Sequence, residues 1–125
     1  MKELFIEGTS ITPKVQFSAD NGLLLLEGRS IPENPEDFYL NLIAWLKEYY
    51  LYYEDVIEIH FKFEYVNSGS TKFLLELLRV VKASLDRGET TLIKWYFEEE
   101  DEAIQELGEH FSESLKIPME IIPLI

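Results

Sequence analysis

The feature that most constrains the fold is a long, strictly alternating stretch in the middle of the chain, Val56 to Val66. Its apolar positions are Ile57, Ile59, Phe61, Phe63 and Tyr65. Its polar positions are Glu58, His60, Lys62 and Glu64. A period of two places these sets on opposite faces of a β-strand. The pattern therefore predicts a sheet that is buried on one face and largely exposed to solvent on the other.

Other strands are predicted on both sides of this one. A short strand at Leu4–Ile6 precedes a hairpin, in which Asp20-Asn21-Gly22 joins Val15–Phe17 to Leu23–Leu26. Asn-Gly is typical of such tight turns. After the long strand, two further segments with strand character are Ile93–Phe97 and a final strand from Pro118 through Ile122.

Three segments show helical spacing. The first has Asn34 as a predicted N-cap, Pro35 at the first helical position, and apolar residues from Phe38 to Tyr49. The second carries an apolar stripe from Leu74 to Leu85 and ends at Arg87-Gly88. The third carries Ala103, Ile104, Leu107 and Phe111.

This order of elements predicts an α/β fold with one domain over residues 1–125. An N-terminal β-hairpin is followed by two β–α crossover units, and about three helices pack mainly on one face of a mixed sheet. With 46% hydrophobic residues, the 125-residue chain can bury one core.

Composition excludes several functions. The chain holds 24 acidic and 11 basic residues, a net charge of −13, which argues against nucleic-acid binding and against binding to anionic membranes. The absence of cysteine excludes disulfides and thiolate metal sites. Met1-Lys2-Glu3 leads directly into strand-like sequence without a signal peptide or a transmembrane run, so we expect a cytoplasmic protein with no membrane insertion.

Motifs for catalysis are scarce, and we expect no enzyme. His60 and His110 lie on different elements without metal-binding spacing, so neither a metal nor a cofactor is predicted, and His60 is interpreted as a surface residue. The acidic run Glu98–Glu102 is interpreted as the solvated start of a helix. A hydrolase that uses scattered carboxylates would need a deep pocket with coupled acids.

A cluster of tyrosines, Tyr49-Tyr50-Leu51-Tyr52-Tyr53, closes the first predicted helix. Some of these rings are expected to cap the core at the helix end. Because tyrosine is also favoured at protein interfaces, a docking patch is the alternative interpretation.

The turn between the long strand and the second helix is chemically unusual for so acidic a chain. It contains Ser68, Gly69, Ser70, Thr71 and Lys72, and no acid. Helix N-termini favour negative charge, so an acid-free start leaves room for an added anion such as a phosphate on serine. The alternative is an ordinary helix cap, in which Asn67 or Ser68 is the capping residue.

Five segments together resemble the SiaC-type regulatory phosphoproteins, in the order in which that family has them. They are Ile6-Glu7-Gly8-Thr9, Thr12-Pro13, Pro32-Glu33-Asn34, Trp45-Leu46 and Tyr65-Val66-Asn67-Ser68. The resemblance continues through Trp95-Tyr96 and the acidic third helix, and so spans nearly the whole chain. It implies a variant of the STAS fold of anti-sigma-factor antagonists.

The resemblance also implies a function. Members of the family are partner-switching proteins: a Ser/Thr protein kinase phosphorylates them in this turn and a PP2C-type phosphatase reverses the modification. The unmodified form binds an effector, in the best-known case a diguanylate cyclase, which implies regulation of cyclic di-GMP.

The same resemblance singles out one residue in the turn. Ser68 occupies the position of the usual phosphoacceptor threonine, and Gly69 replaces a more usual serine. Ser70 and Thr71 are secondary candidates, and Asn67, Gly69 and Lys72 are expected to stabilise the phosphate or to face the partner.

One competing hypothesis comes from a different class of protein. In it the chain is a constitutive acidic adaptor or inhibitor that binds a protein partner without phosphorylation. Detection of phosphate on Ser68 in protein from the native cell would separate the two.

Overall fold

A computed structural model describes residues 1–53 and 55–125. Within these residues the chain forms six strands and three helices. The strands are β1 (Leu4–Ile6), β2 (Lys14–Ser18), β3 (Leu23–Ser30), β4 (Ile57–Val66), β5 (Thr91–Glu98) and β6 (Glu120–Leu124). The helices are α1 (Pro35–Tyr52), α2 (Ser68–Asp86) and α3 (Glu102–Leu115).

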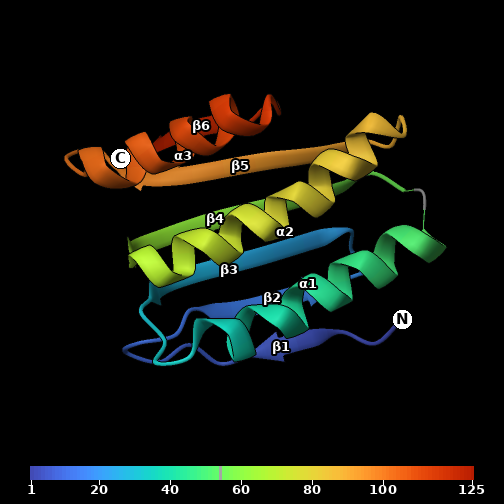
Figure 1. Cartoon of the computed structure of the whole chain (residues 1–125), viewed down its shortest axis with the longest axis horizontal. Coiled ribbons are helices and arrows are strands. Elements are labelled where there is room, and N and C mark those ends of the chain that lie inside the picture. Colours follow the sequence, from blue (N-terminus) through green and yellow to red (C-terminus); the bar gives the residue numbers. More distant parts are fainter. Residues whose placement is uncertain (54) are drawn as a thin grey trace.

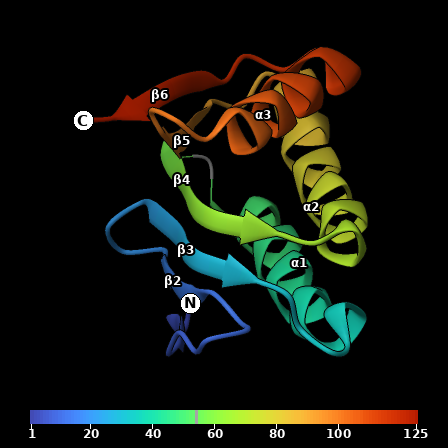
Figure 2. The ribbon, with the colours of Figure 1, turned by 90° about the vertical axis from the view of Figure 1, so that its left-hand side faces the viewer.

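The strands form one mixed sheet in which spatial order follows chain order, from β1 to β6 (Figure 1). β1, β2 and β3 pair antiparallel, and β3 to β6 pair parallel. Crossovers between parallel strands are almost always right-handed. Since the strand order never reverses, that handedness predicts all helices on the same face, and Figure 2 shows α1, α2 and α3 together on one side of the sheet.

The predicted fold class is therefore confirmed, with one correction to its topology. The described residues contain three β–α–β crossovers rather than two, because β3 continues beyond the hairpin and pairs in parallel with β4. β3 runs to Ser30, although its expected end was Leu26. The polar segment Glu27-Gly28-Arg29 hid this extension in the sequence, since its side chains break the apolar run.

The core lies between the sheet and the helices. Its largest fully buried side chains are Trp95, Tyr39, Tyr49, Phe17, Phe61 and Phe111. α3 packs unusually close to the sheet, because Gly108 lies against the Trp95 indole, whose Nε1–H donates to the Ile104 carbonyl at 2.8 Å.

The alternation of β4 is interrupted near its end, and the prediction that Tyr65 faces the core is wrong. Gly28 of β3 pairs with Phe63, while the next residue, Arg29, pairs with Tyr65. Glu64 is thus an extra residue, a β-bulge, which shifts the register of the strand. Beyond the bulge the Tyr65 side chain is 53% exposed.

A further correction concerns His60, which is not a plain surface residue. Its side chain is only 17% exposed. The ring stacks on Tyr96 with centroids 5.6 Å apart, and Nδ1 lies 3.0 Å from the Tyr96 hydroxyl. The neighbouring strand β5 therefore shields His60, although no helix covers this face of the sheet (Figure 2).

Part of the tyrosine cluster caps the core, as one of the two interpretations predicts. Tyr49 and Tyr50 are buried, and Tyr53 stacks on Tyr49 at 4.9 Å, so these rings cap the core. Leu51 and Tyr52 point to solvent, at 77% and 73% exposure.

Smaller differences affect the ends of elements. β4 begins at Ile57 instead of Val56, and β6 covers Glu120–Leu124 instead of 118–122. The acidic run is exposed as expected, with Asp101 as the N-cap of α3. Within the described part of the chain, no helix has the length and apolar content needed to cross a bilayer.

Candidate functional site

The turn between β4 and α2 is very short and firmly held. Only Asn67 separates Val66, the last residue of β4, from Ser68, the first of α2. The Asn67 side chain accepts a hydrogen bond from the Ser70 amide at 2.8 Å, which makes Asn67 the N-cap. The backbone N–H of Asn67 donates to the Ser30 carbonyl at 3.0 Å. The cap is thus fixed to the end of β3 as well as to α2.

The three hydroxyl groups of the turn lie in different environments. Ser68 is exposed. Thr71 is half-buried and its hydroxyl donates back to the Asn67 carbonyl at 3.2 Å. Ser70 is fully buried, with its hydroxyl donating to the Ser30 carbonyl at 3.1 Å.

Beneath the turn, a buried hydroxyl network joins three elements. The Ser30 hydroxyl donates to Ser70 Oγ at 2.8 Å, which leaves the Tyr39 hydroxyl of α1 to donate to Ser30 Oγ. Burial raises the pKa of Tyr39 to about 12, although hydrogen bonding with Ser30 and Ser70 opposes part of that shift. The network therefore ties the start of α2 to β3 and α1 through neutral groups.

The start of α2 differs electrostatically from those of the other helices. The first turn of α2 contains no acid, whereas that of α1 holds Glu36 and Asp37 and that of α3 holds Glu102. Lys72 is exposed, with its ammonium 5.6 Å from the centroid of the Phe73 ring. Unpaired amides and this cation make the helix start favourable for an anion.

The fold also brings the start of α1 next to this turn. A Cβ added at Gly69 would lie 3.4 Å from Pro35 Cγ, so the first turns of α1 and α2 touch. Both helices begin at the same edge of the sheet (Figure 1). Pro35 and Gly69, far apart in the sequence, thus lie next to each other.

Sequence reasoning missed Ser30 and Tyr39, the two partners of Ser70. Ser30 lies in a polar segment after an apolar run, and Tyr39 sits among other core-facing aromatics of α1. Their contacts span up to 40 residues of sequence, so no local spacing could have found them.

In residues 1–53 and 55–125, no group of three or more His, Asp or Glu side chains is placed so that it could hold a metal ion. Of the three hydroxyl groups in the turn, the one on Ser68 is exposed at the start of α2.

A mixed sheet with three helices on one face and an exposed serine at the start of the second helix defines the architecture of this α/β domain. The model of the SiaC family of regulatory phosphoproteins matches residues 6–124, and the chain belongs to this family. It is accordingly a regulatory protein and not an enzyme, as the sequence predicts.

Relatives from Pseudomonas aeruginosa agree with this assignment. An uncharacterised protein of strain UCBPP-PA14 is 27% identical over 121 residues, which cover 97% of this chain and 96% of that protein. The structure of apo-SiaC superimposes with a TM-score of 0.92 at 27% identity and covers 98% of this chain and 99% of its own.

A third comparison involves a complex. The crystal structure of the diguanylate cyclase SiaD with its activator SiaC contains a chain that matches with a TM-score of 0.91 at 26% identity. The match covers 97% of this chain and 99% of the other.

Proposed function

We propose that this protein is a partner switch controlled by reversible phosphorylation of Ser68. A Ser/Thr protein kinase adds the phosphate and a PP2C-type phosphatase removes it. The unphosphorylated form binds and regulates an effector, a diguanylate cyclase, and so acts on cyclic di-GMP.

The observation that carries this proposal is the exposure of Ser68 at the start of α2 in a family of regulatory phosphoproteins. A kinase must reach the hydroxyl that it modifies. Ser70 is fully buried, and the Thr71 hydroxyl is half-buried and bonded to Asn67. Of the three candidates, Ser68 therefore suits the kinase best.

Phosphorylation at this position would change the surface and leave the fold intact. A phosphoserine carries about −1.5 to −2 charges at neutral pH. The acid-free helix start and Lys72 favour that charge, and the hydroxyl network beneath holds the turn in place. A partner docked over the turn would instead meet added bulk and charge, and a penalty of roughly 3 kcal/mol would weaken binding more than a hundredfold.

The choice of effector is supported by the solved complex. SiaC of P. aeruginosa activates the diguanylate cyclase SiaD and was crystallised with it. Since the present chain superimposes on SiaC over nearly its full length, a cyclase of the same type is the natural partner to test.

Intact-mass analysis and peptide mapping of the protein from its native cells test the modification. We expect the mass of one phosphate group on Ser68, lost after phosphatase treatment and absent from Ser68→Ala. Thr71→Val, which removes the neighbouring hydroxyl with almost no change of shape, is the matched control and should remain phosphorylated.

Binding to the cyclase tests the switch. Ser68→Ala should bind as the unmodified wild type does, and Ser68→Asp should bind at least about tenfold more weakly, since its charge is smaller than that of phosphate. Equal binding by both variants would refute the switch. A protein that is never phosphorylated and still binds its partner would instead be a constitutive adaptor.

A further inference from the structure

A long groove runs between α1 and α2 on the outer surface of the helix layer. It encloses about 860 Å³ and extends along α2 from Phe73 to Arg87. Fourteen residues of helix correspond to roughly 21 Å, or four turns. α1 and α2 lie side by side in Figure 1, so two helical surfaces form the walls.

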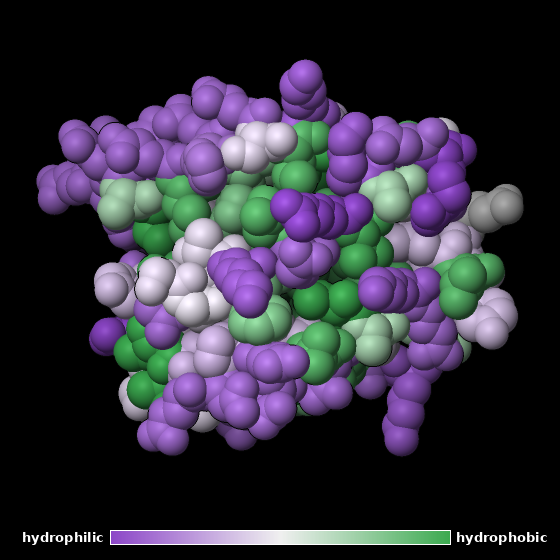
Figure 3. Space-filling model, viewed as in Figure 1, coloured by the Kyte–Doolittle hydropathy of each residue, from purple (hydrophilic) through white to green (hydrophobic). Residues whose placement is uncertain are grey.

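The floor and one margin of the groove are apolar. The lining includes Ile43, Phe73, Val80 and Ala83. Leu40 and Leu51 of α1 line it as well, although they are 49% and 77% exposed. Figure 3 shows hydrophobic residues gathered over the middle of this face with hydrophilic ones around them. Exposed apolar surface of this kind marks an interaction site.

The charges at the groove are opposite to those of the molecule. Lys47, Arg79 and Arg87 line it together with a single acid, Glu76. Three of the chain's 11 basic residues therefore meet one of its 24 acidic ones here. Arg79 pairs with Glu76 at 2.9 Å and Arg87 with Glu89 at 3.2 Å, and both arginine side chains are more than half exposed. At physiological salt the screening length is about 8 Å, so a partner in the groove senses these groups and Lys47 more than carboxylates elsewhere on the molecule.

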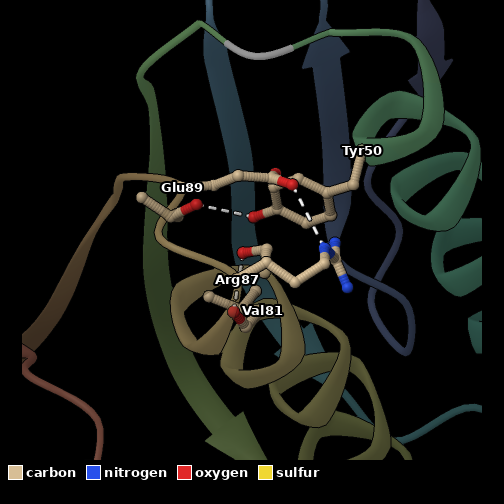
Figure 4. Close-up of polar contacts among 6 residues, drawn as sticks. Tyr50, Val81, Arg87 and Glu89 are labelled. Carbon is tan, nitrogen blue, oxygen red and sulfur yellow. Dashed lines mark hydrogen bonds and ion pairs between the residues drawn. The ribbon is translucent and has the colours of Figure 1, made fainter.

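The far end of the groove is closed by a polar cluster (Figure 4). The Tyr50 hydroxyl of α1 lies 2.7 Å from Thr91 Oγ1 of β5, and Arg87 Nε donates to Glu89 at 3.2 Å. The first contact ties the end of α1 to β5, and the second lies just beyond the end of α2.

The near end of the groove adjoins the candidate switch. Ser68, Lys72 and Arg79 are spaced i, i+4 and i+11, which places them on one stripe along the outer side of α2. Phe73, the first groove residue on α2, lies five residues after Ser68. A phosphate on Ser68 would add negative charge beside the entrance of a positively charged groove.

We propose that the α1–α2 groove binds an amphipathic α-helix of the effector, with its apolar side on the groove floor and acidic residues beside Lys47, Lys72 and Arg79. The proposal rests on the partner switch proposed above and adds the chemistry of the partner. Phosphorylation then acts by like-charge repulsion of the acidic helix and by competition for Lys72.

Other occupants fit this surface less well. A strand from a partner would seek the unpaired backbone of a sheet edge, and the groove presents only helical side chains. A second copy of this chain, or an anionic membrane, would extend beyond the groove over the rest of the surface, where the net charge of −13 repels it.

Substitutions of exposed residues on α1 provide the test, because they do not change the core. Leu51→Glu places a carboxylate in the groove, and Lys47→Glu reverses a charge on its rim. Tyr52→Glu is the matched control: Tyr52 is 73% exposed and adjacent on the same helix, but does not line the groove. Thermal unfolding verifies that all three variants remain folded.

The probe is the purified diguanylate cyclase of the source organism, with affinity measured by titration calorimetry. We expect Leu51→Glu and Lys47→Glu to weaken binding about tenfold or more and Tyr52→Glu to leave it within about twofold. Hydrogen exchange of the complex should show protection along the facing sides of α1 and α2, and in an acidic helical segment of the cyclase.

The possible failures are distinguishable. If the wild type binds and the groove variants bind equally well, or if the protected cyclase segment is basic or extended, the groove proposal is overturned while the proposed function stands. If the unphosphorylated wild type binds no cyclase, the proposed effector is wrong and the groove proposal falls with it.

Discussion

At the scale of single residues, the start of α2 is organised by neutral hydroxyl groups and not by ion pairs. The buried Ser70 hydroxyl is hydrogen-bonded to Ser30, whose hydroxyl is in turn hydrogen-bonded to Tyr39. Ser68, two residues before Ser70, faces solvent. A buried hydroxyl without a partner costs roughly 1–3 kcal/mol, so each member of this chain holds the others in place. The Ser68 side chain is exposed beside this cap, as the proposed modification requires.

The raised pKa of Tyr39, about 12, leads to a pH-dependent stability. Between the unfolded value near 10 and the folded value, the unfolded state loses its proton first, so stability falls as pH rises. In wild type this component should remove up to roughly 2–3 kcal/mol of unfolding free energy between about pH 10 and 12. Tyr39→Phe lacks it.

Urea denaturation of both proteins across this pH range provides the measurement. Other groups, including buried Tyr50, titrate in both proteins and cancel in the difference. Wild type should lose its advantage over Tyr39→Phe as the pH rises. A constant difference would show that Tyr39 ionises as readily in the folded protein as in the unfolded chain.

At the scale of elements, two local features decide which side chains reach the core. The bulge at Glu64 turns Tyr65 outward, next to the candidate switch. On α3, Gly108 removes the side chain that would otherwise hold the helix away from Trp95. Neither feature can be predicted from the hydrophobic periodicity of the sequence. A bulge interrupts that periodicity, and a glycine within a helix reads only as a weak helix former.

We expect Gly108→Ala to destabilise the protein by roughly 1–3 kcal/mol, despite the better helix propensity of alanine. An added Cβ would lie 2.6 Å from Trp95 Nε1, so α3 or the indole would have to move and the bond to Ile104 would be strained. Guanidinium denaturation measures the change.

The matched control is Gly69→Ala, where the new Cβ would meet Pro35 Cγ at an ordinary 3.4 Å. That variant should stay within about 0.5 kcal/mol of wild type. Equal effects of the two substitutions would contradict the close packing of α3.

At the scale of the whole molecule, the two faces of the sheet differ: helices cover one face and leave the other exposed. Because strand order advances without reversal, the helices gather on one face and the other face of the sheet remains uncovered (Figure 2). The net charge of −13 is spread over a small protein, and self-repulsion of this kind opposes the compact state.

Added salt should therefore stabilise the protein at neutral pH. Raising KCl from about 0.01 to 0.15 M shortens the screening length from about 30 to 8 Å and should raise the thermal midpoint by roughly 3–8 °C. The same change at about pH 5, where part of the carboxylates are neutral, should have a smaller effect. Identical shifts at both pH values would mean that salt acts by another route.

Much of the fold was predictable, because its signals are local. The alternation of β4 up to Phe63, the Asp20-Asn21-Gly22 turn and the Asn34-Pro35 helix start each appear in a short window of sequence, and all three are confirmed. The third crossover was not predicted, since the partner of β3 depends on contacts far along the chain.

The sequence by itself determined the class of the fold and the position of the acid-free turn, because composition and periodicity are properties of neighbouring residues. The family was indicated by the resemblance of several segments to the SiaC-type phosphoproteins. The tertiary structure alone decided which hydroxyl of that turn is exposed. Ser68 and Ser70 are equivalent in composition, but only Ser70 meets Ser30, a contact across 40 residues. The groove between α1 and α2 likewise exists only in the folded protein. Its lining residues come from two helices that are far apart in the sequence.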